Sequence, residues 1–214
     1  MFVSVPAVRD LVIEAVEGSA ELIGRPLCAQ RWNDPSALPG MTVGALCAHL
    51  VRAAGAVIAY LDRTDPDAVP AGALLTPVTY FHAAIDSPIH EQIKTVSATE
   101  ASAGPAHVAA RCAEVAAQLR ARLAAEPGDR LVAALGNRML SLDDFCRTRL
   151  IEVLYHLDDL AASLGIDPPE TNPDGRTIVI DILVGIARDQ RGDRAVLHAL
   201  GRGERLTSAV FPIL

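Results

Sequence analysis

Aromatic residues and lysine are scarce in this sequence of 214 residues. Aromatic side chains make up 4% of the chain, and Lys94 is its single lysine. Half of the residues are apolar and 21% are charged, so the composition is that of a globular protein and not of a disordered one. The formal net charge of −7 lacks the concentrated basic charge of a nucleic-acid surface, and we expect no nucleic-acid partner.

Signals for export and for membrane insertion are also missing. Residues 1–6 lack the basic-then-apolar order of a signal peptide, and no uninterrupted apolar run approaches the ~20 residues of a membrane helix. The most apolar stretch, 43–61, is broken by His49 and Arg52. The four cysteines include no C-x-x-C pair, which is typical of buried, reduced thiols. We therefore expect a cytoplasmic protein with no membrane partner.

Helical periodicity dominates what is present. Apolar residues recur at spacings of three and four in four long segments, at about 6–23, 42–61, 105–126 and 141–164. Ser141 and Asp144 resemble a capping box, and Gly165 suits the end of the same helix. We predict one all-α domain over residues 1–214, a four-helix bundle with extra short helices.

The remaining segments are predicted less sharply. A helix broken at Pro88 is predicted over residues 77–101, and residues 130–140 are predicted as an extended segment or a hairpin. Two further helices are predicted at about 174–190 and 193–201, after the break at two consecutive prolines.

A row of ionisable residues runs along the helix predicted over 141–164. Arg149, Glu152, His156 and Asp159 follow one another at steps of three or four, while most other positions of this helix are apolar. Such a helix has little freely solvated face, so we predict that the row points inward. Buried charges must be paired or must bind a metal ion, because desolvation is otherwise costly.

Glu152 and His156 suit metal binding because residues four apart project from one helix face, with Cβ atoms ~5–6 Å apart. His49, in the middle of an otherwise apolar helix, is the leading third ligand. Three protein ligands and one open position describe a catalytic zinc site. Spacing alone also allows the alternative of a hydrogen-bonded core histidine, and a second acid-x3-His match occurs at Asp86 and His90, interrupted by a proline.

Two segments resemble the motifs of a known family. Residues 39–50, Pro-Gly-Met-Thr-Val-Gly-Ala-Leu-Cys-Ala-His-Leu, look like the first metal-ligand motif of the mycothiol-dependent maleylpyruvate isomerase N-terminal family, within the DinB-like metal-binding superfamily. Residues 148–161 resemble its second motif, Arg-Leu-x-Glu-x3-His-x2-Asp-Leu. Residues 201–205 resemble the end of the family's last helix. The resemblance runs in order from about residue 6 to residue 206.

The resemblance implies a DinB-like bundle, mostly of up-down-down-up topology, that binds zinc or a similar divalent ion through His49, Glu152 and His156. It also implies the use of mycothiol in isomerisation or thiol transfer. Two departures stand out. Met41 occupies a position where many relatives have Trp, and the sequence ends near residue 214, without the additional C-terminal domain of the isomerases. We therefore expect thiol transfer ahead of maleylpyruvate isomerisation.

A metal-dependent mycothiol S-transferase or isomerase-like enzyme is thus the leading prediction, with a small-molecule thiol and an electrophilic substrate as partners. A coordinated cation would deprotonate a thiol whose ordinary pKa is ~8.5. Arg149 and Asp159 would orient Glu152 and His156, with ordinary ion pairing as the equal alternative. A hydrolase or lyase using metal-bound hydroxide, and a non-enzymatic protein that senses or stores a metal or ligand, are the rival functions. The oligomeric state, a homodimer included, is left open.

Overall fold

The computed structural model describes residues 7–85, 89–135, 138–202, 204 and 212, with the side chains at 85 and 89–91 left out of the description. Parts of the C-terminal motif at 201–205 therefore lie outside the described residues. The helices and strands are, in chain order, α1 (Val8–Ile23), α2 (Pro26–Gln30), α3 (Val43–Arg63), α4 (Pro77–Ile85), α5 (Ile89–Ala101), α6 (Pro105–Ala125), β1 (Leu131–Ala134), β2 (Arg138–Ser141), α7 (Leu142–Leu164), α8 (Pro173–Arg191) and α9 (Asp193–Gly201).

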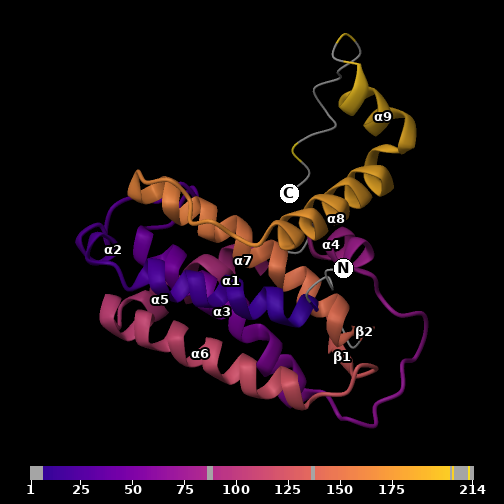
Figure 1. Ribbon diagram of the computed structural model, residues 1–214, viewed down its shortest axis with the longest axis horizontal. Helices are drawn as coiled ribbons and strands as arrows, with labels where there is room; N and C mark the ends of the chain where they lie inside the picture. The colour runs from indigo at the N-terminus through magenta and orange to yellow at the C-terminus, as the bar shows by residue number, and fades with distance from the viewer. Residues whose placement is uncertain (1–6, 86–88, 136–137, 203, 205–211, 213–214) are drawn as a thin grey trace, which may run out of the picture.

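Four long helices form a bundle in which α1 and α3 each pack against both α6 and α7 (Figure 1). Arg9, at the start of α1, reaches carbonyl groups at the end of α6, so these helices are antiparallel. Arg122 and Asp62 pair at the ends of α6 and α3, which are parallel. Tyr60, near the end of α3, stacks on Phe145 at the start of α7. The predicted all-α bundle of up-down-down-up topology is confirmed.

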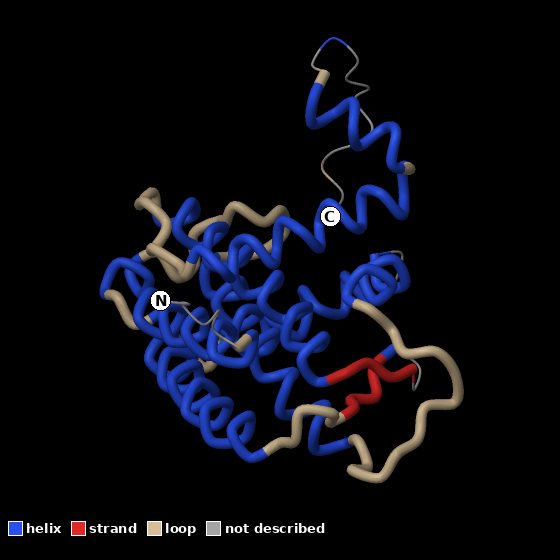
Figure 2. Tube along the Cα trace, turned by 45° about the vertical axis from the view of Figure 1, so that its right-hand side comes forward, coloured by secondary structure: helices blue, strands red, loops and turns tan. Residues whose placement is uncertain are grey.

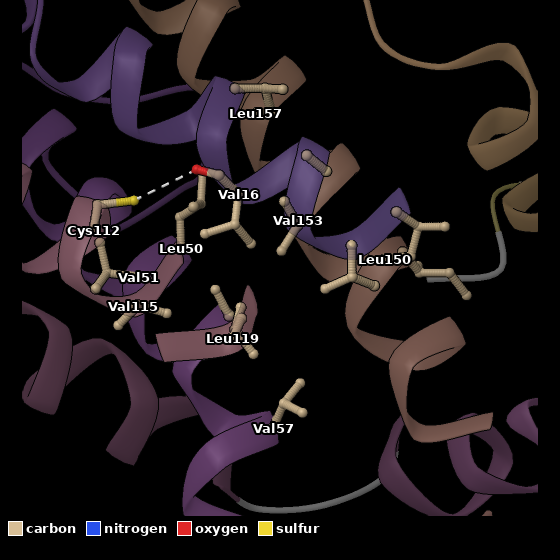
Figure 3. Close-up of a cluster of buried hydrophobic side chains, with 14 of the residues drawn as sticks. Val16, Leu50, Val51, Val57, Cys112, Val115, Leu119, Leu150, Val153 and Leu157 are labelled. Atoms are coloured by element: carbon tan, nitrogen blue, oxygen red, sulfur yellow. Dashed lines mark hydrogen bonds between the residues drawn. The ribbon is translucent and has the colours of Figure 1, made fainter. Parts of the chain in front are cut away.

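The hydrophobic core lies between these four helices. Figure 3 shows a part of it in which side chains from α1, α3, α6 and α7 meet, among them Val16, Leu50, Leu119 and Val153, all of them buried. The Cys112 thiol contacts the carbonyl oxygen of Val16 at 3.9 Å. Helix α3 is long and apolar enough to cross a membrane by length and composition alone, but most of it is buried inside the bundle. Its hydropathy is therefore accounted for by its place in the core.

Capping residues mark the ends of α3, which carries His49, and of α7, which carries Glu152 and His156. The Thr42 hydroxyl accepts a hydrogen bond from the Ala45 N–H at the start of α3, and the Ser141 hydroxyl accepts one from the Asp144 N–H at the start of α7. Gly165 ends α7 in the left-handed conformation, at φ +68°, which a glycine adopts without strain. Local sequence thus fixes where both helices begin and where α7 ends.

Shorter elements cover the ends of the bundle. Strands β1 and β2 form an antiparallel hairpin in which Val132 lies opposite Leu140, so the hairpin alternative for residues 130–140 is confirmed (Figure 2). The helix expected over 77–101 is divided into α4 and α5, as predicted; residues 86–88 between them are not described. The five-residue helix α2 was not predicted.

The last two helices, α8 and α9, lie outside the four-helix bundle. Helix α8 packs against α4, α7 and α1, whereas α9 packs mainly on α8. Ala187 and Val196 join α8 to α9 in a small apolar cluster of their own. Figures 1 and 2 show α9 standing away from the four bundle helices, and the side chains of Leu197 and Leu200 are 69% and 66% exposed.

Candidate metal centre

The antiparallel packing of α3 on α7 brings three predicted ligands together. His49 comes from the middle of α3, and Glu152 and His156 come from successive turns of α7. One donor atom from each of the three residues lies within 4.8 Å of the other two. The two imidazole rings are 4.5 Å apart between centroids, and the His156 Nε2 is 3.4 Å from the Glu152 Oε2. We call these three residues the metal cluster.

Asp159 lies beside one of the two histidines, on the side away from Glu152. Its Oδ2 is 3.2 Å from the Nδ1 of His156, so the Nε2 of that ring is the atom that faces Glu152. A carboxylate behind the second nitrogen of a histidine ligand fixes the ring and raises its basicity. The predicted role of Asp159 therefore has the geometry that it requires.

His49 contributes a buried imidazole nitrogen with an unmet hydrogen-bonding capacity. Its Nδ1 is buried and has no hydrogen-bond partner among the described residues. Burial, followed by the neighbouring charge of His156, lowers the pKa of His49 to about 4. The ring is therefore neutral at pH 7, which is the form that coordinates a metal ion. A buried polar atom without a partner is unfavourable, and a ligand at this nitrogen would relieve that cost.

Glu152 and His156 each stabilise the charged form of the other. Burial opposes ionisation of Glu152, but the hydrogen bond from His156 and the charge of Arg149 outweigh it and lower the pKa of Glu152 to about 2. Burial likewise disfavours protonated His156, but its hydrogen bonds with Asp159 and Glu152 prevail and raise the pKa of His156 to about 9. Without a metal ion, the cluster therefore holds a proton on His156 between two carboxylates.

The cluster lies on the wall of a cavity of about 1020 Å³, which all three of its residues line. Arg149, one turn before Glu152, is 8% exposed and also lines this cavity. Its Nη2 donates a hydrogen bond to the Tyr80 hydroxyl at 3.1 Å, and its Nε donates one to the Thr148 hydroxyl at 3.2 Å. Arg149 thus lowers the pKa of Glu152 through its charge, while one of its hydrogen bonds joins it to Tyr80.

Tyr80 was missed by sequence reasoning. It lies on α4, in a segment predicted only as a broken helix, and nothing in its local pattern places it beside α7. Sequence reasoning also missed Arg52 and Glu100, which line the same cavity with the Arg52 Nε 4.0 Å from the Glu100 Oε2. Met41, which was noted as a departure from the family motif, lines the cavity. The second acid-x3-His match, at residues 86 and 90, lies outside the described side chains.

The comparisons with known proteins agree with this arrangement at the level of the family. No curated protein and no solved structure matches the chain. The family described as the mycothiol maleylpyruvate isomerase N-terminal domain matches residues 14–161, which include His49, Glu152 and His156. This match spans more than half of the chain and contains both motifs on which the resemblance was based, and the DinB-like superfamily is consistent with it. The chain therefore belongs to the mycothiol maleylpyruvate isomerase N-terminal domain family.

Proposed function

We propose that this protein is a metal-dependent enzyme that uses mycothiol, acting as an S-transferase or as an isomerase-like enzyme. The observation that carries the proposal is the convergence of His49, Glu152 and His156 at the wall of a large cavity. The family name supports the choice of thiol. Free, buried cysteines fit the reducing cytoplasm, where we place the enzyme.

The cluster residues fit a divalent ion such as zinc. Two imidazoles and one carboxylate are a common ligand set of catalytic zinc sites, which keep a position open for water or substrate. The buried, unpartnered Nδ1 of His49 supports the presence of a ligand beside that ring. His49 and His156 would hold the ion as neutral ligands, and Glu152 would supply one negative charge. A bound divalent ion supplies the chemistry of lowering the pKa of a coordinated thiol, so that a thiolate is available at neutral pH.

The hydrogen bond from Arg149 leaves the hydroxyl proton of Tyr80 available to a substrate. A guanidinium group only donates, so the Tyr80 oxygen is the acceptor and its own proton is not used in this bond. Burial raises the pKa of Tyr80, against the opposing charge of Arg149, so the hydroxyl remains protonated at neutral pH. We propose that it donates a hydrogen bond to an oxygen atom of the electrophilic substrate in the cavity. The cavity volume of about 1020 Å³ is at the upper end of ligand pockets and leaves room for thiol and substrate together.

Cobalt substitution tests the proposal. Protein loaded with Co(II) and titrated with mycothiol should develop a sulfur-to-metal charge-transfer band. His49→Ala should abolish both metal retention and the band, because it removes one of three ligands. His107→Ala is the matched control, since His107 is exposed and lines the same cavity but is not part of the cluster.

Two results would redirect the assignment. Metal retained without any spectral response to mycothiol would favour the hydrolase or lyase that uses metal-bound hydroxide. Metal content left unchanged by His49→Ala would show that the cluster is not the metal site.

A further inference from the structure

Two buried cysteines from different helices lie side by side. Cys28, on α2, and Cys47, on α3, have their Sγ atoms 3.4 Å apart, and both residues are fully buried. The two other cysteines differ from them, since Cys112 contacts the carbonyl oxygen of Val16 and Cys146 is a separate free thiol. The close pair is therefore a specific feature of the packing of α2 on α3.

The distance between the two sulfurs is short enough for a bond to form with little rearrangement. A disulfide has an S–S distance of ~2.05 Å, so the sulfurs would have to approach by roughly 1.3 Å. Helix α3 lies in the middle of the bundle, whereas α2 has five residues and few neighbours. The displacement would therefore fall on α2 and leave the position of α3 in the core unchanged.

Trp32 keeps the two segments close. Its indole lies directly over Gly44, one turn before Cys47, so that a Cβ atom on Gly44 would come within 2.5 Å of the ring. The Trp32 carbonyl accepts a hydrogen bond from the Gly44 N–H at 2.8 Å, and its Nε1 donates one to the Ala101 carbonyl at 3.3 Å. These contacts hold the end of α2 against the first turn of α3, and the two thiols with it.

The pair is separate from the metal cluster although it is close in sequence. Cys47 precedes His49 by two residues, and side chains two apart on a helix do not share a face. His49 faces Glu152 and His156 on α7, whereas Cys47 contacts Cys28 on α2. An effect at the cysteine pair can therefore be measured without any assumption about the proposed function.

We propose that Cys28 and Cys47 are an oxidative modification site that forms an intramolecular disulfide on reaction with a hydroperoxide. Brief opening of the short helix α2 would admit the oxidant. The Cys28 thiolate attacks the O–O bond, giving a sulfenic acid at Cys28 and releasing an alcohol, or water when the oxidant is hydrogen peroxide. The Cys47 sulfur then displaces the sulfenic oxygen as water. The two sulfurs together lose two electrons, which the O–O bond takes up. The contact with the Cys47 sulfur lowers the pKa of Cys28, against the opposing effect of burial, and this favours Cys28 as the attacking thiolate.

The test uses the full-length reduced protein and hydrogen peroxide. Trypsin cleaves after Arg31, so Cys28 and Cys47 fall on separate peptides unless they are joined. We expect the intact mass to fall by two hydrogen atoms and the two peptides to appear as one cross-linked species that dithiothreitol separates. The melting temperature should rise on oxidation, because the cross-link restricts the unfolded chain.

Variants assign the bond to this pair. Cys28→Ala should abolish both the mass loss and the rise in melting temperature, and Cys112→Ala should leave both unchanged. The mass and peptide map of the unmodified protein decide the question even if Cys28→Ala does not fold. The proposal is overturned if peroxide leaves both thiols open to alkylation after denaturation, converts them separately to sulfinic acids, or joins either of them to another cysteine.

Discussion

Asp158 and Asp159 are adjacent on α7 but have different surroundings. Comparing their variants measures how much a carboxylate beside His156 contributes to metal affinity. Asp159 contacts the Nδ1 of His156, whereas Asp158 is exposed. Asp159→Asn should weaken metal binding by roughly 10–100-fold, because the ring loses its orienting carboxylate and some basicity. Asp158→Asn should bind as tightly as the unmodified protein. Competition with a coloured chelator measures both, and equal affinities for the two variants would refute the role of Asp159.

Metal affinity should also depend on pH through a single histidine. The pKa of His156 is about 9 in the metal-free protein, so at pH 7 its proton must leave before the nitrogen can coordinate. His49, with a pKa of about 4, is already neutral. The apparent affinity should therefore rise about tenfold for each pH unit between 6 and 8 and level off above about 9. Chelator competition at several pH values, corrected for the chelator's own protonation, measures this slope. A flat profile would contradict it.

Sequence reasoning named the three residues of the cluster and their neighbours Arg149 and Asp159, but it did not find Tyr80. The spacing of Glu152 and His156 predicted a shared helix face. The place of His49 in an otherwise apolar helix made it the leading third ligand, and the resemblance of residues 39–50 to the family's first metal-ligand motif supported that choice. Metal binding by the three stays a prediction. Tyr80 was out of reach because its position depends on how α4 packs against α7, and periodicity carries no information about contacts between distant segments.

At the scale of helices, Trp32 packs so closely against α3 that a larger residue cannot replace Gly44 without a clash. A Cβ atom there would lie 2.5 Å from the Trp32 ring, which is buried. Gly44→Ala should lower the free energy of unfolding by about 1–3 kcal/mol through overpacking, more than the ~1 kcal/mol that alanine contributes to helix propensity. At Gly18, in α1, such a Cβ would meet no described atom within 4 Å apart from the neighbouring backbone of its own helix. Gly18→Ala should therefore stabilise the protein by about 0.5–1 kcal/mol.

Urea denaturation of the two glycine variants gives both values. Opposite signs are the expected outcome. Equal destabilisation of both variants would show that the packing of Trp32 on α3 does not cause the loss of stability in Gly44→Ala.

Helix boundaries were predictable where capping residues mark them, and obscure where they do not. Thr42, Ser141 and Gly165 mark the ends of α3 and α7 by hydrogen bonds that these residue types make locally. Helix α2 was missed because it begins at Pro26, and a proline shortly after the end of a helix is also typical of a break in the chain. A helix of five residues has too few positions to show a period.

At the scale of the whole molecule, Arg9 joins three helices at one end of the bundle. From α1 it donates hydrogen bonds to the carbonyl groups of Leu123 and Glu126 at the end of α6, and it pairs with Asp143 at the start of α7 at 2.7 Å. Arg9→Gln should lower the free energy of unfolding by about 1–3 kcal/mol, since several partly buried acceptors lose their donor. Thermal or urea denaturation measures the loss.

A second ion pair provides the control for Arg9. Arg120 and Glu17 also join α6 to α1, at 2.6 Å, but both side chains are largely exposed. Arg120→Gln should leave the unfolding midpoint unchanged, because solvent screens exposed pairs. Similar losses of unfolding free energy for the two variants would show that burial does not explain the contribution of Arg9 to stability.

The topology of the bundle was expected only from the family resemblance, since periodicity predicts helices and not their order in space. The assignment of residues 1–214 to one domain stays a prediction. Helix α9 lies beyond the matched family segment and packs mainly on α8, so neither the family match nor the bundle core determines its position.

The placement of α1 between α6 and α7 has a consequence for protein synthesis. Its apolar face, with Val12 and Val16, finds its permanent neighbours on α6 and α7 only after roughly a hundred further residues have been made. At 5–20 residues per second, this interval is on the order of ten seconds. During that time α1 is available to chaperones and proteases while later helices are still being translated. The last bundle helix made, α7, completes the cover of the first, so closure of the nascent bundle coincides with the arrival of Glu152 and His156.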